Sequence, residues 1–370
     1  MTPTPPSRPL PTPREDASQI STRTVRAALA SFGIGRIKRI SRLHGGAGTA
    51  RKFLVEIKQD QQTPGDEAPG STSPSDHGIR LLLKCAPRDS ASLDRIVVRH
   101  AVVKQLASAG VPVAAPREDS RGGTVLADAS RVYELIPFIE GESWKASPAR
   151  ARGAGGLLAR LHDATGEIDA SVLARLRPPT GFLAGDDLQS LVGSGFTADD
   201  GTELGFLRGT LAECLDRVRA VGLGPAMPAL LVHGDFHPGN MRWRGDDVAG
   251  LFDFDACRRG FAIEEAALAS VHFSIDRGSK AMDARAPWPD TDLLEAFWIG
   301  YAGIRPIDER HARAVPWIAA GAFAIEALSG SNSGTFSPET IAFASGVVAW
   351  LVEHADGLGE LIAQAGPATP

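Results

Sequence analysis

The spacing of apolar residues changes near residue 140, and this change constrains the fold more than any other feature of the sequence. Between residues 34 and 139 apolar and polar residues alternate in short runs, which indicates half-buried β-strands. From residue 147 apolar residues recur every three or four positions over longer stretches, which indicates helices. A chain of 370 residues with both patterns predicts an α+β protein with two lobes. The N-terminal lobe is expected to be an antiparallel sheet with one main helix, and the C-terminal lobe to be mainly helical.

The N-terminal pattern predicts five strands and two helices. A first helix capped by Ser21 or Thr22 ends at Gly33, and a second runs from about residue 90 to residue 108. The second helix has an expected apolar face of Ile96, Val97, Ala101, Val103 and Leu106. The strands are expected at residues 34–43, 51–57, 79–85, 125–127 and 132–139.

The C-terminal pattern predicts helices with short strands between them. The first helix starts at Ser147, an N-cap followed by a proline. Further helices are expected at residues 203–220, 261–274, 291–302, 308–328 and 338–364, and short strands at 229–232, 241–244 and 249–252. The lobes then span residues 21–139 and 147–370, joined by a connector at 140–146.

Two segments are too polar or too rich in proline to fold into a core. Residues 1–20 form an expected disordered tail, and residues 59–78 a flexible insertion between two strands. The net charge of −5 argues against a general nucleic-acid-binding protein. The sequence contains no run of 18 apolar residues, so it predicts no membrane-spanning helix. The three cysteines are scattered, which favours a reducing cytoplasm.

The segment His233-Gly234-Asp235-Phe236-His237-Pro238-Gly239-Asn240 carries the strongest chemical signal, together with Asp253-Phe254-Asp255. An Asp and an Asn five residues apart in one loop can align a hydroxyl and hold a magnesium ion at the same phosphate, and a separate Asp completes the metal site. A simple polar turn is the plain alternative, since Gly, Asp, Pro and Asn all favour turns. A zinc site at His233 and His237 would need a helix, which Gly234, Pro238 and Gly239 disfavour.

These two motifs resemble those of the aminoglycoside phosphotransferase and choline kinase family, which are relatives of the protein kinases. The resemblance covers about residues 34–275 and implies a bilobal, protein-kinase-like fold. It implies that Asp235 is the catalytic base and that Asn240 and Asp253 bind Mg²⁺. His233 is expected to brace the loop, while His237 and Asp255 are candidates for supporting or substrate-binding roles.

The N-terminal lobe would bind the nucleotide by the same resemblance. Lys84 ends the third strand and would contact the phosphates of ATP, as would the backbone at Gly45, Gly46 and Gly48. Pro137 and Ile139 would contact the adenine edge. The Glu that usually pairs with this lysine is missing: His100 occupies the matching position, which leaves the partner of Lys84 open.

The resemblance implies an ATP- and Mg²⁺-dependent phosphotransferase that acts on a hydroxyl of a small molecule: an amino alcohol, an aminoglycoside-like antibiotic or a sugar. A catalytically weak nucleotide-binding or scaffold protein is the alternative. The acceptor pocket is expected to be formed by the mainly helical region after residue 256, and its acidic candidates for binding a cationic amine are Asp255, Glu264, Glu265 and Asp276. The acceptor, the choice between ATP and GTP, and the oligomeric state stay open.

Overall fold

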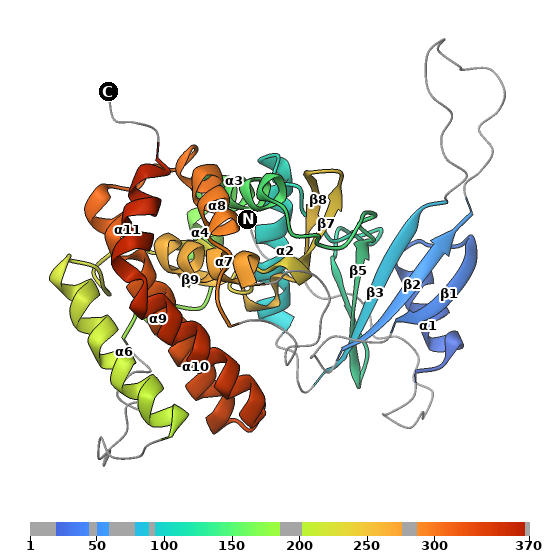
Figure 1. The fold of residues 1–370 in the computed structure, drawn as a ribbon. Helices are drawn as coiled ribbons and strands as arrows, with labels where there is room; N and C mark the ends of the chain where they lie inside the picture. The colour runs from blue at the N-terminus through green and yellow to red at the C-terminus, as the bar shows by residue number, and fades with distance from the viewer. Residues whose placement is uncertain are drawn as a thin grey trace, which may run out of the picture. The chain divides into compact units, whose positions relative to one another are not determined.

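The protein is represented by a computed structural model that describes residues 20–43, 50–58, 78–88, 93–185, 202–275 and 287–366. The chain divides into two compact units (Figure 1). The first unit contains residues 1–107 and 114–139, and the second contains residues 108–113 and 140–370. The glycine turn with Gly45, Gly46 and Gly48, nearly all of the expected tail and insertion, and Asp276 lie outside the described residues.

The first unit is built on one five-stranded antiparallel sheet with the strand order β1-β2-β3-β5-β4. The sheet comprises β1 (Ile37–Leu43), β2 (Arg51–Ile57), β3 (Arg80–Pro87), β4 (Val125–Ala127) and β5 (Arg131–Pro137). Helix α1 (Thr22–Ser31) places Val25 and Leu29 against Leu83 and Leu135 in the core. Because side chains alternate across a strand, the neighbours of these core residues, Lys84 and Glu134, face the opposite side of the sheet.

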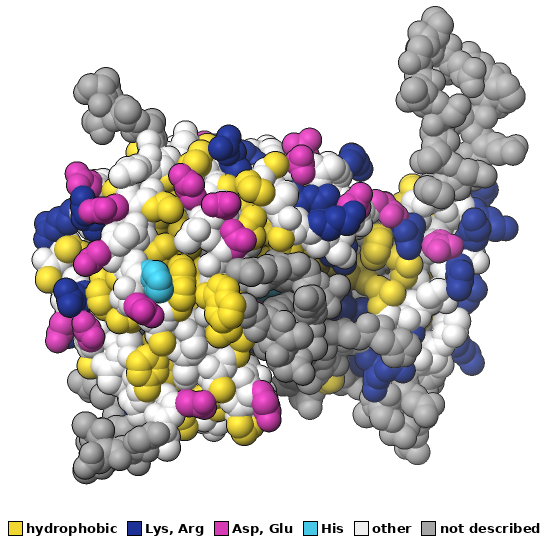
Figure 2. All heavy atoms as spheres, viewed as in Figure 1, with side chains coloured by type: hydrophobic (Ala, Val, Ile, Leu, Met, Phe, Trp, Pro, Cys, Tyr) yellow, Lys and Arg dark blue, Asp and Glu magenta, His cyan; other side chains and the backbone are white. Residues whose placement is uncertain are grey.

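That opposite side receives the second helix, α2 (Leu93–Ser108), whose Arg99 and His100 contact Glu134. The α2 face differs from the expected one at Val97, which is 43% exposed, while Val98 and Val102 are buried. The spacing of apolar residues could not decide which of the two adjacent valines, Val97 or Val98, faces the core. On the surface, basic side chains gather over β1 and β2, and charges of both signs are mixed over the helical unit (Figure 2).

The second unit is mainly helical. Its long helices are α3 (Pro148–Asp163), α6 (Glu203–Ala220), α7 (Ala262–Ile275), α8 (Thr291–Ala302), α9 (Glu309–Asn332), α10 (Pro338–Glu353) and α11 (Ala355–Gln364). Shorter turns of helix are η1 (Ala164–Glu167), α4 (Ala170–Leu173), η2 (Pro238–Asn240) and η3 (Phe254–Ala256). Helices α3 and α8 approach closely because both contribute glycine: a Cβ on Gly155 would lie 2.0 Å from the Phe297 carbonyl oxygen.

Two small antiparallel pairs of strands are embedded in this helical unit. Strand β6 (Leu230–Val232) pairs with β9 (Arg258–Gly260), and β7 (Met241–Arg244) pairs with β8 (Asp247–Leu251). The sequence pattern missed β9, whose two arginines do not alternate with apolar residues. The long helix expected at 338–364 is divided at His354 into α10 and α11, which are bent by 71°.

The antiparallel sheet and the helical second unit confirm the predicted α+β fold class. Within the described residues, α9 passes a length and hydropathy test for a membrane span, as does the bent pair α10–α11 when taken as one segment. However, 78% of the apolar window of α9 is buried inside the protein, as expected for a core helix.

Candidate active site

The loop from His233 to Asn240 is held at both ends by strands. It leaves β6, which pairs with β9, and enters β7, which pairs with β8. The turn at Gly234 has φ +80°, and a Cβ there would lie 2.4 Å from the carbonyl oxygen of Ala256. Only glycine fits this left-handed position without moving the neighbouring backbone. The backbone path of the loop therefore depends on Gly234.

His233 connects this loop to the segment that carries Asp253. Its ring is completely buried, its Nε2 lies 3.1 Å from the carbonyl oxygen of Phe252, and its Nδ1 accepts a hydrogen bond from the Asp235 N–H at 3.2 Å. Burial lowers the pKa of His233, so the ring is neutral at pH 7, with Nε2 as the donor. Both ring nitrogens are thus engaged with the backbone, which leaves neither for zinc.

Glu265 on α7 holds the same loop by its main chain. Its two carboxylate oxygens accept hydrogen bonds from the N–H groups of Gly234, at 2.5 Å, and His233, at 3.1 Å. The carboxylate also lies 2.9 Å from Nε2 of His162, whose Nδ1 is 2.9 Å from the Tyr301 hydroxyl. Burial would raise the pKa of Glu265, but the hydrogen bond and charge of His162 outweigh it and lower the pKa. Helices α3, α7 and α8 therefore fix the loop through this one carboxylate.

Asp235 keeps its carboxylate accessible while its neighbours hold it ionised. Its side chain is 52% exposed, and Oδ2 accepts a hydrogen bond of 2.8 Å from Nδ2 of Asn240. On the other side, Nε2 of His237 lies 3.6 Å from Oδ1, and Nδ1 of His237 accepts from the Gly239 N–H. Partial burial would raise the pKa of Asp235, but His237 and Asn240 more than offset it and lower the pKa.

The Asn240 side chain and Asp253 lie at the same end of the β7–β8 hairpin. The backbone carbonyl oxygen of Asn240 accepts a 3.0 Å hydrogen bond from the N–H of Phe252, the residue before Asp253. Since Nδ2 of Asn240 donates to both the carboxylate and the backbone carbonyl of Asp235, the amide oxygen faces away from Asp235. An amide oxygen and a carboxylate are ligands suited to Mg²⁺, which takes its remaining ligands from phosphates and water.

The backbone of Asp253 is in a strained conformation. Its φ is +69° and its ψ is +59°, and it is the only residue other than glycine with a positive φ in the described part of the chain. For a residue with a Cβ this conformation costs about 1–2 kcal/mol, and such strain concentrates at functional sites. Asp255, two residues later, is exposed on η3. The donor set at Asn240 and Asp253 fits a magnesium ion carried by a nucleotide.

In the first unit, a buried charge cluster surrounds Lys84. Lys84 on β3 and Glu134 on β5 are directly opposed in the sheet register, and both are buried. Glu134 also forms an ion pair with Arg99 and lies 2.7 Å from Nε2 of His100. Burial would raise the pKa of Glu134, but the His100 hydrogen bond and the charges of Arg99 and Lys84 hold it at about 2. Strand β5 thus places an ionised carboxylate opposite Lys84 in the sheet, whereas α2 carries no glutamate.

The residues expected to contact adenine lie at the end of β5. The last strand hydrogen bond runs from the Phe138 N–H to the Arg80 carbonyl, at 3.0 Å. Pro137 is exposed and Ile139 is half-buried. Their backbone groups therefore lie where the strand pairing ends.

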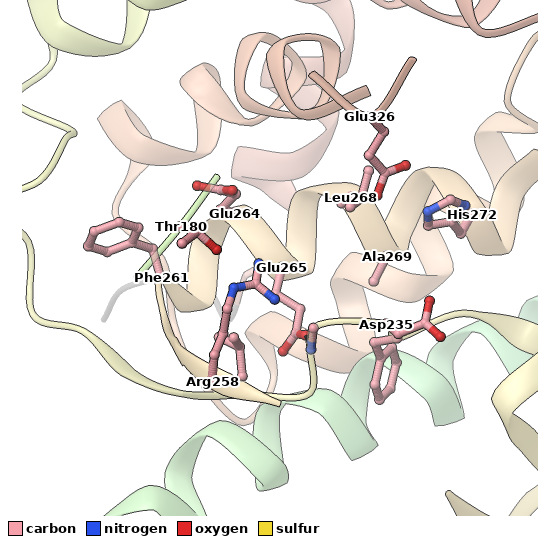
Figure 3. A pocket seen from close by; sticks show the side chains of 13 residues that line it. Thr180, Asp235, Arg258, Phe261, Glu264, Glu265, Leu268, Ala269, His272 and Glu326 are labelled. Atoms are coloured by element: carbon pink, nitrogen blue, oxygen red, sulfur yellow. Dashed lines mark hydrogen bonds between the residues drawn. The ribbon is translucent and has the colours of Figure 1, made fainter. Parts of the chain in front are cut away.

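A pocket opens beside Asp235 within the second unit (Figure 3). Its empty volume is about 500 Å³, counting the space at its open mouth, which is within the roughly 300–1,000 Å³ of small-molecule sites. The lining combines residues of the loop, α7, α9 and the segment around Thr180: Thr180, Val232, Gly234, Asp235, Phe236, Arg258, Phe261, Glu264, Glu265, Leu268, Ala269, His272 and Glu326.

Two of the acidic residues expected to bind an amine are already engaged with the backbone. Glu264 accepts hydrogen bonds from the N–H groups of Phe182, at 3.0 Å, and Leu183, at 2.8 Å, while Glu265 holds the loop. Burial raises the pKa of Glu264 to about 7. The sequence interpretation missed Glu326, which reaches the pocket from α9.

Comparison of the structure with known proteins places this fold among kinases of small molecules. The chain resembles an amicoumacin kinase solved with AMP-PNP, Ca²⁺ and Ami: the TM-score is 0.61 and the identity 14%, over 91% of this chain and 94% of the other. A microcompartment-associated aminopropanol kinase gives a TM-score of 0.60 at 16% identity, over 91% and 99% of the two chains. At sequence identities this low, the similarity to these solved structures shows the shared fold alone.

The sequence itself defines the family. Residues 72–312 match the phosphotransferase enzyme family (APH), and the chain belongs to this family. A homoserine kinase of Rhodopseudomonas palustris is 29% identical over 66% of this chain and 68% of its own length. An uncharacterized protein of Deinococcus radiodurans is 28% identical over 65% and 68%. The predicted family resemblance is confirmed, and the chain is a phosphotransferase with an alcohol group as acceptor, as the sequence predicted.

Proposed function

We propose that the protein transfers the γ-phosphate of ATP, in a Mg²⁺-dependent reaction, to a hydroxyl of a small molecule. The observation that carries this proposal is the pairing of two loops. His233 joins the loop of Asp235 and Asn240 to that of Asp253 by hydrogen bonds, and the small-molecule pocket opens at Asp235. This pairing of the two loops supports a common role for Asp235, which would align the hydroxyl, and for Asn240 and Asp253, which would bind the metal ion.

Asp235 acts as the catalytic base. Its ionised carboxylate accepts a hydrogen bond from the acceptor hydroxyl and points the hydroxyl oxygen at the γ-phosphorus. As the new O–P bond forms, the bond from the γ-phosphorus to the β,γ-bridging oxygen breaks and ADP leaves. The hydroxyl proton passes to Asp235 and then to water. Because the pKa of Asp235 is low, its main contribution is alignment, and the proton is transferred late.

Asn240 and Asp253 are the residues that would hold the magnesium ion, through the Asn240 amide oxygen and the Asp253 carboxylate. When bound, the ion neutralises charge on the phosphates. His233 keeps the two loops in one register, and His237 supports the Asp235 carboxylate from the side opposite Asn240. Asp255 is exposed and is a candidate for substrate contact.

The residues of the first unit bind the nucleotide in this proposal. The ammonium group of Lys84, positioned by Glu134, contacts the phosphates, as does the backbone at Gly45, Gly46 and Gly48. Pro137 and Ile139 offer a carbonyl oxygen and an N–H to the adenine edge. Residues 21–139 then form the nucleotide-binding lobe, residues 140–146 the connector, and residues 147–370 the catalytic and acceptor-binding lobe.

The acceptor is a small alcohol of the kind that the relatives' names indicate, such as homoserine or aminopropanol. The protein would work in a reducing cytoplasm. This fits its three cysteines, which are buried and not joined in disulfides; burial raises the pKa of Cys85 and Cys214 to about 12, which keeps these two thiols inert.

The test is the substitution Asp235→Asn in the full chain. Acceptor-dependent ADP release should fall by roughly 10²- to 10⁴-fold, the usual contribution of a positioned acid or base, while ATP affinity stays near that of the wild type. Asp216→Asn, at an exposed position on α6, is the matched control. Near-normal turnover in Asp235→Asn would refute the proposed role. A wild-type chain that binds ATP with Mg²⁺ but releases no ADP with any acceptor would instead be a nucleotide-binding scaffold.

A further inference from the structure

We propose that Glu326 makes the acceptor pocket specific for small alcohols that carry a protonated amine. This inference rests on the phosphotransferase activity proposed above and adds to it the class of acceptor and the residue that selects it. Glu326 lies on α9, 91 positions after Asp235 in the sequence, and the two carboxylates line the same pocket (Figure 3).

The first observation is that Glu326 is directed into the pocket without a protein partner. Its side chain points from α9 toward α7 across the cavity (Figure 3). Among the residues that the structure describes, none forms a hydrogen bond or an ion pair with its carboxylate. Glu264 and Glu265, by contrast, are both fully engaged with backbone N–H groups. Apart from Asp235, which is proposed to align the acceptor hydroxyl, Glu326 is therefore the acidic side chain of the pocket lining that is left for a ligand.

The second observation is the charge balance around it. The Glu326 side chain is exposed to solvent through the open cavity, and the protein packed around it still desolvates the carboxylate enough to raise its pKa to about 7. The charge of Asp235 adds to the rise, while the charges of His237 and Arg258 oppose it. A positively charged ligand group between the two carboxylates would relieve this repulsion and keep Glu326 ionised.

The third observation concerns geometry. Asp235 is proposed to align the acceptor hydroxyl, so an acceptor in this pocket has its hydroxyl at one carboxylate and a second group near the other. Apolar side chains of α7, at Leu268 and Ala269, line the wall between them. The pocket therefore presents a carboxylate, an apolar wall and a second carboxylate in that order. A short carbon chain with a hydroxyl at one end and an ammonium group at the other is complementary to this arrangement. A neutral sugar would leave Glu326 without a counter-charge.

The experiment uses three acceptors that share a three-carbon chain with a terminal hydroxyl: homoserine, 3-aminopropan-1-ol, which lacks its carboxylate, and 4-hydroxybutanoate, which lacks its amine. Steady-state ADP release is measured for the wild type, Glu326→Gln and Glu326→Asp. The wild type should prefer the aminated acceptors. Glu326→Gln should lower kcat/KM for them by roughly 10- to 100-fold, the usual loss for a hydrogen bond to a charged group. The loss should appear mainly in KM.

The controls separate recognition from folding. Glu326→Gln should not lower kcat/KM for 4-hydroxybutanoate, because this acceptor has no amine for the carboxylate to bind and the substitution removes a negative charge that repels it. Glu326→Asp should recover part of the lost kcat/KM with the amines. Glu353→Gln, at an exposed position on α10, should change nothing. Equal loss for all three acceptors, or no loss for any, would overturn the inference.

Failure of the inference and failure of the proposed function give different results. A wild-type enzyme that phosphorylates neutral alcohols or sugars but no aminated acceptor would overturn the role of Glu326 and leave the phosphotransferase proposal intact. A wild-type chain that releases no ADP with any acceptor of a broad panel would reject both.

Discussion

The substitution Glu265→Gln tests how the catalytic loop is positioned. The Glu265 side chain is 8% exposed and accepts hydrogen bonds from the N–H groups of His233 and Gly234 while it contacts His162. Glutamine has one carbonyl oxygen in place of two carboxylate oxygens, so its NH₂ group must face at least one backbone N–H. One charge-assisted hydrogen bond is lost and one buried donor is left without an acceptor.

The magnitude follows from those two losses. A hydrogen bond to a charged group contributes about 1.5–3 kcal/mol, and removal of one partner of a buried ion pair costs up to about 3–5 kcal/mol. We expect a loss of about 3 kcal/mol in the free energy of unfolding, which for a cooperative unit of roughly 150–250 residues lowers Tm by about 6–12 °C. Displacement of the loop should also lower kcat by about 10²-fold, with little change in KM for ATP.

The assay is thermal unfolding of the wild type, Glu265→Gln and the exposed control Glu295→Gln between pH 4 and pH 8, with kinetics at pH 7.5. Because the folded-state pKa of Glu265 is lowered, its contribution to stability is present above its unfolded pKa and disappears as pH falls through the folded pKa. The Tm difference between wild type and Glu265→Gln should therefore be full from pH 8 down to about pH 5, and it should start to shrink only at the acidic end of the range, below the ordinary pKa of 4.5. An unchanged Tm and kcat at pH 7, or a Tm difference independent of pH, would refute the reasoning.

Two further substitutions test the residues that are proposed to bind the nucleotide and the metal ion. Glu134→Gln removes the negative charge between Lys84 and Arg99, so their repulsion should displace the Lys84 ammonium group; KM for ATP should rise about 10-fold, whereas Glu118→Gln, at an exposed ion pair, should leave it unchanged. An unaltered KM for ATP in a folded Glu134→Gln protein would separate Lys84 from nucleotide binding. Asp253→Gly removes the strain of a left-handed backbone conformation, which costs about 1 kcal/mol in a residue with a Cβ. The greater conformational freedom of glycine in the unfolded chain offsets part of this gain, so Tm should stay the same or rise slightly. Turnover should fall by at least about 10²-fold, because the carboxylate is lost. A clear loss of stability would show that the Asp253 carboxylate supports the fold, and retained turnover would remove it from the metal site.

The sequence predicted the strands of the sheet and most of the helices because their apolar residues follow the strand and helix periods. It failed where tertiary contacts decide. Strand β9 carries arginines and is a strand only because β6 lies beside it. The helix expected over 338–364 has no proline or internal glycine pair at its break, and the bend at His354 was not visible in the pattern.

The candidate site shows the same division. Asp235, Asn240 and Asp253 belong to local motifs, so the sequence could single them out, and their roles stay predictions. A search along α2 could not find Glu134, the carboxylate that lies opposite Lys84 in the sheet register, because it comes from the adjacent strand. Glu326 lies among alanines of a buried helix, and only the packing of α9 over α7 brings it to the pocket.

The hydrogen bonds of His233 have a consequence for how new acceptors could be accommodated. One imidazole ring ties the backbone before Asp253 to the backbone at Asp235, so neither carboxylate can be displaced without the other. A change of acceptor to a larger or differently charged alcohol therefore has to leave these two loops unaltered and replace other residues of the pocket. Helix α9 supplies such a residue: a substitution at position 326 would change which alcohol binds without moving Asp235 or Asp253.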